Sequence, residues 1–243
     1  MTPDISHLSA ALEATWPAAE LVEQGGWRLR RGADGGKRVS AATRAPGAPD
    51  AGAADVEAAA AAMRAWGQPA LFRINEGEDG LDRTLADIGY LKADETTVFA
   101  AEAGALIDAR PETARIIRGG TRIALMEEIW AAGGVGPGRL AVMARAPEPK
   151  AYMIARLGDR PAAVAFAATS GEIAAVHALE TLAAARRQGA ARMLMSGAAR
   201  FAEENGARWL ALAVTERNIA ASTLYRALGM APATKYHYRV RPD

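Results

Sequence analysis

Apolar residues recur along the chain with two different periods, which separate predicted helices from predicted strands. Spacings of three and four residues predict helices over residues 4–16, 53–66, 81–90, 120–131, 138–145, 188–205 and 217–228. Short apolar or alternating runs predict strands over residues 69–74, 95–101, 151–157, 161–169, 173–182, 208–214 and 235–240. The stretch GGWRLRRGADGGKRVSAAT predicts a β-hairpin whose turn is ADGG.

The order of these elements predicts two units, with a boundary near residue 103. Residues 1–102 are interpreted as a smaller α/β N-terminal domain, and residues 102–112 as a bridge. In residues 103–243, two helices precede three strands with tight turns, which form an antiparallel meander, and then two helix–strand pairs follow. The fold class predicted is α/β (α+β), with a mixed, largely antiparallel central sheet flanked by helices.

Composition excludes several kinds of chemistry. The 243 residues contain no cysteine and three histidines, so thiolate chemistry is excluded and no metal site is expected. A net charge of +1 gives no reason to expect nucleic acid as a partner. The sequence shows neither an apolar run of about 20 residues nor a basic segment followed by an apolar one at its start, so we expect a cytoplasmic protein without a membrane partner, either monomer or homodimer.

A glycine turn with free backbone amides lies between a predicted strand and the long helix over residues 188–205. The first N–H groups of a helix have no acceptors within it, so this end attracts anions. The segment adds positive charge, small side chains and room for close approach through Arg186, Arg187, Gln188, Gly189, Ala190, Ala191 and Arg192. These features fit a pyrophosphate, although the segment is neither a nucleoside-triphosphate loop nor a dinucleotide fingerprint.

The pattern Arg186-x-x-Gly189-x-Ala191 resembles the acetyl-CoA pyrophosphate loop of the GNAT superfamily of N-acetyltransferases. Downstream, NIAASTLYRALGM is similar to a second helix motif of that superfamily, with Asn218, Ala221, Tyr225 and Gly229 in register and Met230 in place of an aromatic residue. The resemblance covers roughly residues 120–240, and it implies a GNAT fold, acetyl-CoA as cosubstrate and an amine acceptor.

The resemblance also implies a wedge between the strands over 173–182 and 208–214, which diverge to admit the pantetheine arm. Backbone groups of Leu179, Glu180, Thr181 and Leu182 would pair with the arm as an added strand does. Asn218 and Ser222 are the polar positions expected to face the cosubstrate, but Asn218 could equally be an ordinary helix N-cap.

Without a cysteine to carry the acyl group, direct attack by the amine on acetyl-CoA is the economical mechanism. The resemblance places Tyr225 beside the departing sulfur as proton donor, the alternative being an aromatic residue wedged between helix and sheet. Candidates for the base are Glu180, His177 and, less favoured, Glu172, with a water relay as the alternative. His177 and Glu180 reach one amine only if a bulge intervenes between them, as it often does in the superfamily.

Three questions stay open at this level. The segment PALFRI–LDRTLADIGY–ETTVFAA parallels the strand, helix and strand that end the chain, which indicates a degenerate GNAT-like half without a CoA loop, or else an unrelated α/β cap. The acceptor, a small molecule or a peptide amine, is not specified by any motif. A module that binds acyl-CoA without turnover, as a sensor or scaffold, is the alternative to an enzyme.

Overall fold

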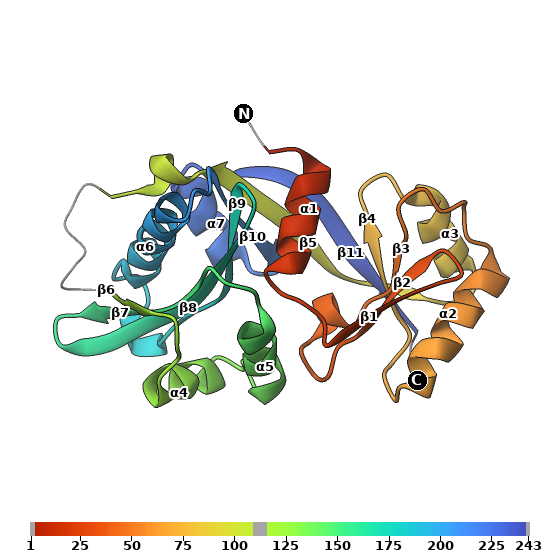
Figure 1. Cartoon of the computed structure of the whole chain (residues 1–243), viewed down its shortest axis with the longest axis horizontal. Helices are drawn as coiled ribbons and strands as arrows, with labels where there is room; N and C mark the ends of the chain where they lie inside the picture. Colours follow the sequence, from red (N-terminus) through yellow and green to blue (C-terminus); the bar gives the residue numbers. More distant parts are fainter. Residues whose placement is uncertain (1–2, 109–115, 242–243) are drawn as a thin grey trace.

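The computed structural model describes residues 3–108 and 116–241, and its central feature is one eight-stranded sheet that runs through both halves of the chain (Figure 1). The strand order is β4-β11-β5-β10-β9-β8-β7-β6, and β9 and β10 are its parallel pair. The strands are β4 (Leu71–Asn75), β5 (Leu91–Glu102), β6 (Ile116–Gly119), β7 (Lys150–Leu157), β8 (Arg160–Ser170), β9 (Ile173–Thr181), β10 (Trp209–Thr215) and β11 (Ala231–Val240). The prediction of a mixed, largely antiparallel sheet is confirmed.

Helices cover both faces of this sheet, because its central strands are apolar on both sides. On one face, α6 (Ala190–Glu204) and α7 (Ile219–Ala227) enclose a core that includes Phe99 and Leu212. On the other face lie α1 (Ile5–Ala14), α4 (Ala124–Ala132) and α5 (Pro137–Arg145), where α1 packs across β8, β9 and β10. Asp4 caps α1, since its carboxylate accepts from the N–H groups of Ser6 and His7.

The N-terminal half adds a second, smaller sheet of β1 (Glu20–Gln24), β2 (Trp27–Arg31) and β3 (Thr43–Arg44), covered by α2 (Ala53–Ala65) and α3 (Asp79–Asp87). Here the predicted hairpin is wrong. The tight turn lies at Gly25–Gly26, both with positive φ, and joins β1 to β2. The segment ADGG instead leads into a 3-10 helix, η1 (Lys37–Val39).

A repeat relates the two halves. β4, α3 and β5 recur as β10, α7 and β11, each 140 positions further along, including the left-handed glycines Gly89 and Gly229 that end the two helices. The hydrogen-bond register recurs as well, since Thr96 pairs with Thr215 and Tyr236 pairs with Asn75. The strand–helix–strand parallel expected from the sequence is therefore confirmed.

The two halves exchange strands. β5 of the N-terminal half lies between β10 and β11, and β11 of the C-terminal half lies between β5 and β4. The sheet thus contains strands from both sides of the predicted domain boundary at residue 103. That boundary stays a prediction. Part of the predicted bridge over 102–112 lies outside the described residues, and its beginning forms a 3-10 helix, η2 (Ala103–Leu106).

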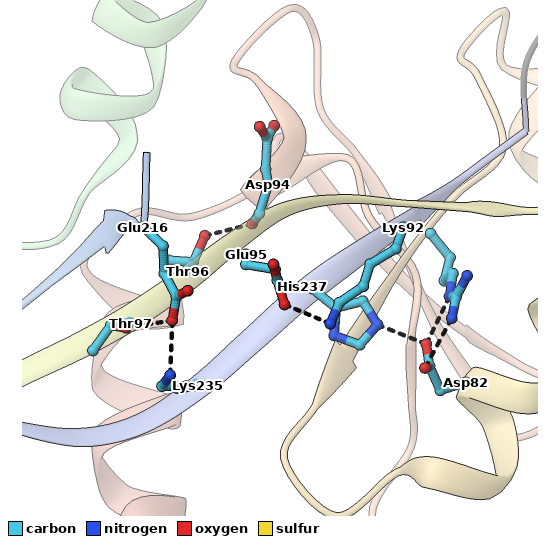
Figure 2. A network of polar contacts seen from close by, with 10 residues as sticks. Asp82, Lys92, Asp94, Glu95, Thr96, Thr97, Glu216, Lys235 and His237 are labelled. Atoms are coloured by element: carbon cyan, nitrogen blue, oxygen red, sulfur yellow. Dashed lines mark hydrogen bonds and ion pairs between the residues drawn. The ribbon is translucent and has the colours of Figure 1, made fainter. Parts of the chain in front are cut away.

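Ion pairs reinforce the exchange where β11 meets the N-terminal half (Figure 2). His237 Nε2 lies 2.6 Å from Asp82 Oδ1, and Arg239 donates to both oxygens of the same carboxylate at 2.7 and 2.9 Å. Within the C-terminal half, Lys235 of β11 also pairs with Glu216, which follows β10, at 2.8 Å. A two-pronged arginine–carboxylate contact of this kind fixes geometry as well as charge, so it holds β11 to α3.

Candidate active site

The parallel strands β9 and β10 separate partway along their length. Their pairing is limited to Ile173–Ala175 opposite Trp209–Ala211. Beyond these residues β9 pairs with β8 alone and β10 with β5 alone, so the backbone edge of β9 after Ala175 faces an opening. The wedge expected from the sequence is present, and Leu179, Glu180, Thr181 and Leu182, all half-buried, line its β9 side.

A bulge in β9 turns the side chains at the wedge. Ala178 has a φ of 47°, and the pairing with β8 shifts so that Phe166 faces His177 while Val164 faces Glu180. His177 and Glu180 therefore point to the same face of the sheet, as the expected bulge requires. The indole of Trp130, on α4, donates to the carbonyl of Ala178 at 2.7 Å and so fixes the bulge. The sequence reasoning missed this contact, which joins residues 48 positions apart.

The N-terminus of α6 opens at the mouth of the wedge. Gly189 is its N-cap with a φ of 88°, and no side chain caps the helix. The first turn carries no acidic residue, whereas Arg186, Arg187 and Arg192 are exposed around it. A β-carbon at Gly189 would meet nothing within 4 Å, so the conformation, not a lack of space, is what favours glycine here. Free amides and positive charge at one place make an anion-binding site.

The corresponding helix of the N-terminal half is closed to anions. α2 follows β3 as α6 follows β9, but the carboxylate of Asp55 in its first turn accepts from the N–H of Gly52 at 2.9 Å. An acidic side chain therefore occupies the place that a phosphate would take, and it would repel one. The N-terminal half therefore lacks the open helix start that α6 has.

Tyr225 and Glu180 approach the wedge from opposite faces of the sheet. Tyr225, on α7, is buried with its ring centroid 6.0 Å from that of Phe99, and its hydroxyl makes no hydrogen bond to another described residue. Burial, and next the charge of Glu180, raise the pKa of Tyr225 to about 12. The carboxylate of Glu180 lies against Gly133, where a β-carbon would come within 2.6 Å of it. Burial raises the pKa of Glu180, while the charges of Arg186 and Arg139 oppose that change.

His177 is enclosed instead. It is 3% exposed, between the rings of Trp16 at 5.0 Å and Phe166 at 6.2 Å. Its Nε2 lies 2.9 Å from Thr15 Oγ1 and its Nδ1 lies 3.2 Å from Arg38 Nη2. Burial, and then the charge of Arg38, hold the pKa of His177 well below 6.5. Both ring nitrogens are engaged, so in this arrangement the imidazole holds neighbours rather than a ligand.

The remaining sequence candidates fall in different places. Asn218 caps α7, its side chain accepting from the N–H of Ala221 at 3.1 Å, so the structural interpretation of this residue is confirmed. Ser222 is half-buried on the same helix. The structure does not favour Glu172 as the base. It is exposed in the β8–β9 turn, just before the start of β9, whereas Glu180 is near the end of that strand.

Comparisons with known proteins agree with this geometry. Residues 123–230, which include β9, α6 and α7, match the model of the acetyltransferase (GNAT) family. The chain contains a GNAT acetyltransferase domain. A relative from Bacillus subtilis (strain 168), described as the uncharacterized N-acetyltransferase YobR, is 26% identical over 98% of this chain and 99% of its own length. The family match and this relative both support an N-acetyltransferase.

Solved structures extend the likeness in fold beyond the GNAT domain. A GCN5-related N-acetyltransferase from Kribbella flavida has a TM-score of 0.74 and 23% identity, covering 98% of this chain and 95% of that one. A tandem GNAT protein from the clavulanic acid biosynthesis pathway has a TM-score of 0.60 and 15% identity, covering 94% and 86%. A tandem fold agrees with the internal repeat seen here.

The described parts of the chain show neither a metal-binding cluster nor a membrane-spanning helix. Among residues 3–108 and 116–241, no three His, Asp or Glu side chains gather in a way that could hold a metal ion. In the same residues, no helix combines the length and apolar character needed to cross a bilayer.

Proposed function

We propose that this GNAT domain transfers the acetyl group of acetyl-CoA to a primary amine by direct attack, with both substrates bound together. One observation carries the proposal: a wedge between β9 and β10 has an anion-binding helix start at its mouth and the side chains of Tyr225 and Glu180 on its two sides. A pyrophosphate site, a channel and two groups suited to proton transfer are thus joined.

The residues present fit acetyl-CoA. Backbone amides at the start of α6 would bind the pyrophosphate, with Gly189 providing the turn and Arg186, Arg187 and Arg192 providing charge. The free edge of β9 would hydrogen-bond the pantetheine amides, as a peptide adds to a sheet edge. When bound, acetyl-CoA supplies the thioester that the amine attacks.

The side chains then divide the proton transfers. A primary amine has a reference pKa near ~10 and is mostly an ammonium at neutral pH, so a base must remove its proton. Glu180 is half-buried at the wedge with a raised pKa, which makes its carboxylate the more suitable acceptor than the enclosed His177. As the new N–C bond forms and the C–S bond breaks, the hydroxyl of Tyr225 donates to the departing sulfur.

Calorimetric titration with CoA tests the first requirement of this proposal. Gly189→Glu places negative charge against the phosphates, so we expect CoA binding to be lost. Gly189→Asn is the matched control, because asparagine tolerates the left-handed backbone conformation and adds no charge. Retained affinity in Gly189→Glu, or no CoA binding by the wild type, would refute the proposed function.

A further inference from the structure

A small cavity lies on the α1 side of the sheet, where the two halves of the chain meet. It measures about 60 Å³ and is lined by residues of α1, β4, β5, β10 and β11 together with Arg38 of η1. Its volume is about that of two water molecules in the liquid, which suits a group of a few atoms. Two arginines of the N-terminal half, Arg38 and Arg73, contribute to its lining.

Neither arginine forms an ion pair within the described residues, although Arg73 is near enough to Glu78 for its charge to oppose the rise that burial causes in the pKa of that carboxyl. Arg73 lies over the ring of Tyr236 at 5.6 Å, and its Nε is buried without a hydrogen-bond partner. Arg38 lies over Trp16 at 5.2 Å and contacts His177. Across residues 3–108 and 116–241, no carboxylate forms an ion pair with either guanidinium, although half-buried arginines are normally paired.

The other charged residues in the lining offset these two only in part. Lys235 is paired with Glu216 at 2.8 Å, whereas the carboxylate of Glu76, which accepts a hydrogen bond from Thr234 at 3.1 Å, sets one negative charge against the two guanidinium groups. Burial lowers the pKa of Arg38, Tyr236 and Tyr238 oppose that change, and the nearby positive charges of Arg73 and Arg139 add to it. The cavity is therefore electropositive.

His177 holds Arg38 in place. Because its pKa is held well below 6.5, His177 is neutral, and its Nδ1 accepts from Arg38 while its Nε2–H donates to Thr15. Thr15 in turn donates to the carbonyl of Ala11 at 2.7 Å. This chain of hydrogen bonds fixes the tautomer and makes His177 a positioning residue for Arg38.

The cavity lies close to the reacting groups. The strand partners of His177 and Glu180 are two residues apart on β8, so the Cα atoms of His177 and Glu180 are roughly 7 Å apart. Arg38 touches His177 on the face to which Glu180 also points. Arg38 and Glu180 are therefore both neighbours of His177 on one face of the sheet, at a separation within the length of a short molecule.

We propose that Arg38 and Arg73 bind a carboxylate of the acceptor, so that the substrates of this N-acetyltransferase are amino acids or similar small amines that carry a carboxylate. The planar guanidinium matches a carboxylate in shape and charge, and the cavity has room for such a group. This inference rests on the proposed function and adds the substrate class to it.

Matched acceptor pairs test the inference. The twenty protein amino acids and ornithine would be assayed for CoA thiol release beside the decarboxylated amines of lysine, ornithine, tyrosine, tryptophan and histidine. We expect the carboxylated member of an active pair to have the higher kcat/KM by about 10- to 100-fold, the value of hydrogen bonds to a charged group.

Variants then assign the preference to the two arginines. Most of the preference for carboxylated acceptors should be lost in Arg73→Gln and in Arg38→Gln, because the KM for these acceptors rises. The affinity for acetyl-CoA should stay unchanged. Arg73→Lys should keep part of the preference. The exposed Arg83 of the same half provides the control Arg83→Gln, which should behave as the wild type.

Each other outcome is decisive. Equal or better turnover of the decarboxylated amines would overturn the inference, as would a protein that binds acetyl-CoA but acetylates no amino acid in the panel. A preference that survives in both Arg73→Gln and Arg38→Gln would also overturn it. Failure to bind acetyl-CoA would instead refute the proposed function, and the inference with it.

Discussion

Replacing Tyr225 by phenylalanine removes one hydroxyl from the wedge and little else. The ring is 7% exposed and contacts Phe99, and these contacts are the same for phenylalanine. The hydroxyl makes no hydrogen bond within the described residues, so its removal leaves no protein group unpaired. The variant therefore isolates what the hydroxyl does for the departing sulfur.

The size of the effect follows from the raised pKa of Tyr225. Its value of about 12 compares with about 8.5 for an ordinary thiol, so complete proton transfer to a thiolate is uphill by about 3.5 units, or ~5 kcal/mol. The hydroxyl thus stays protonated and stabilises the sulfur as a hydrogen-bond donor. Such a bond to a charged group contributes about 1.5–3 kcal/mol, and we expect kcat to fall about 10- to 100-fold.

Single-turnover thiol release, followed with saturating acceptor, measures this step without the contribution of product release. Acetyl-CoA affinity should stay unchanged. Tyr90→Phe removes a tyrosine hydroxyl on the far side of the N-terminal half and serves as the control. An unchanged rate in Tyr225→Phe would refute the assigned role, and a loss above about 10³-fold would show full general-acid catalysis, for which 10²–10⁴ is typical.

Three further predictions concern titrating groups. Because burial raises the pKa of Glu180, kcat/KM of the wild type should rise with pH along a limb above pH 4.5. Glu180→Gln should abolish that limb and lower kcat/KM about 10²–10⁴-fold. A limb that persists in the variant would exclude Glu180 as the base. The folded-state pKa of His177 is depressed, so the unfolded chain takes up a proton below pH 6.5 and the free energy of unfolding falls by about 1.3 kcal/mol from pH 7 to 5.5. In urea denaturation, His177→Gln should lose that much less stability than the wild type over this pH range. An equally steep loss in the variant would contradict the prediction. The pKa of Asp82 is lowered from 3.8 to about 2, chiefly by its hydrogen bonds from Arg239, so its contribution to the free energy of unfolding is present above pH 3.8 and is lost towards pH 2. The full shift corresponds to about 2.4 kcal/mol, which solvent screening reduces to about 1 kcal/mol. Unchanged thermal unfolding of Asp82→Asn at pH 7 would exclude that contribution.

The cosubstrate side of the proposed site could be predicted from the sequence because that side is built from short segments. Gly189 and its neighbours form one turn, and Tyr225 lies in one helix motif, so a local pattern identifies each of them. The wedge could be expected too, since the two strands flank this loop and helix. The same locality explains why Asn218 was left with two interpretations: a cap and a ligand contact need the same residue type.

The acceptor side depends on contacts between distant segments, which no local pattern records. His177 was a reasonable candidate for the base until Thr15, 162 positions earlier, and Arg38, 139 positions earlier, proved to engage its two nitrogens. β1 was missed because its residues, ELVEQ, are almost all exposed and show no buried alternation. The strand exchange was out of reach for a similar reason, since β5 and β11 each pair with strands from the other half.

The exchanged strands give one polypeptide the geometry that a symmetric dimer of single GNAT domains would have if its subunits traded their last strands. In such a dimer both copies would change together, because one sequence encodes them. A fused chain is free of that constraint, and the two halves differ: one has an open helix start at Gly189, while Asp55 closes that of the other. In the proposed function, this asymmetry would let one half bind the donor while the other turns its side chains towards the acceptor.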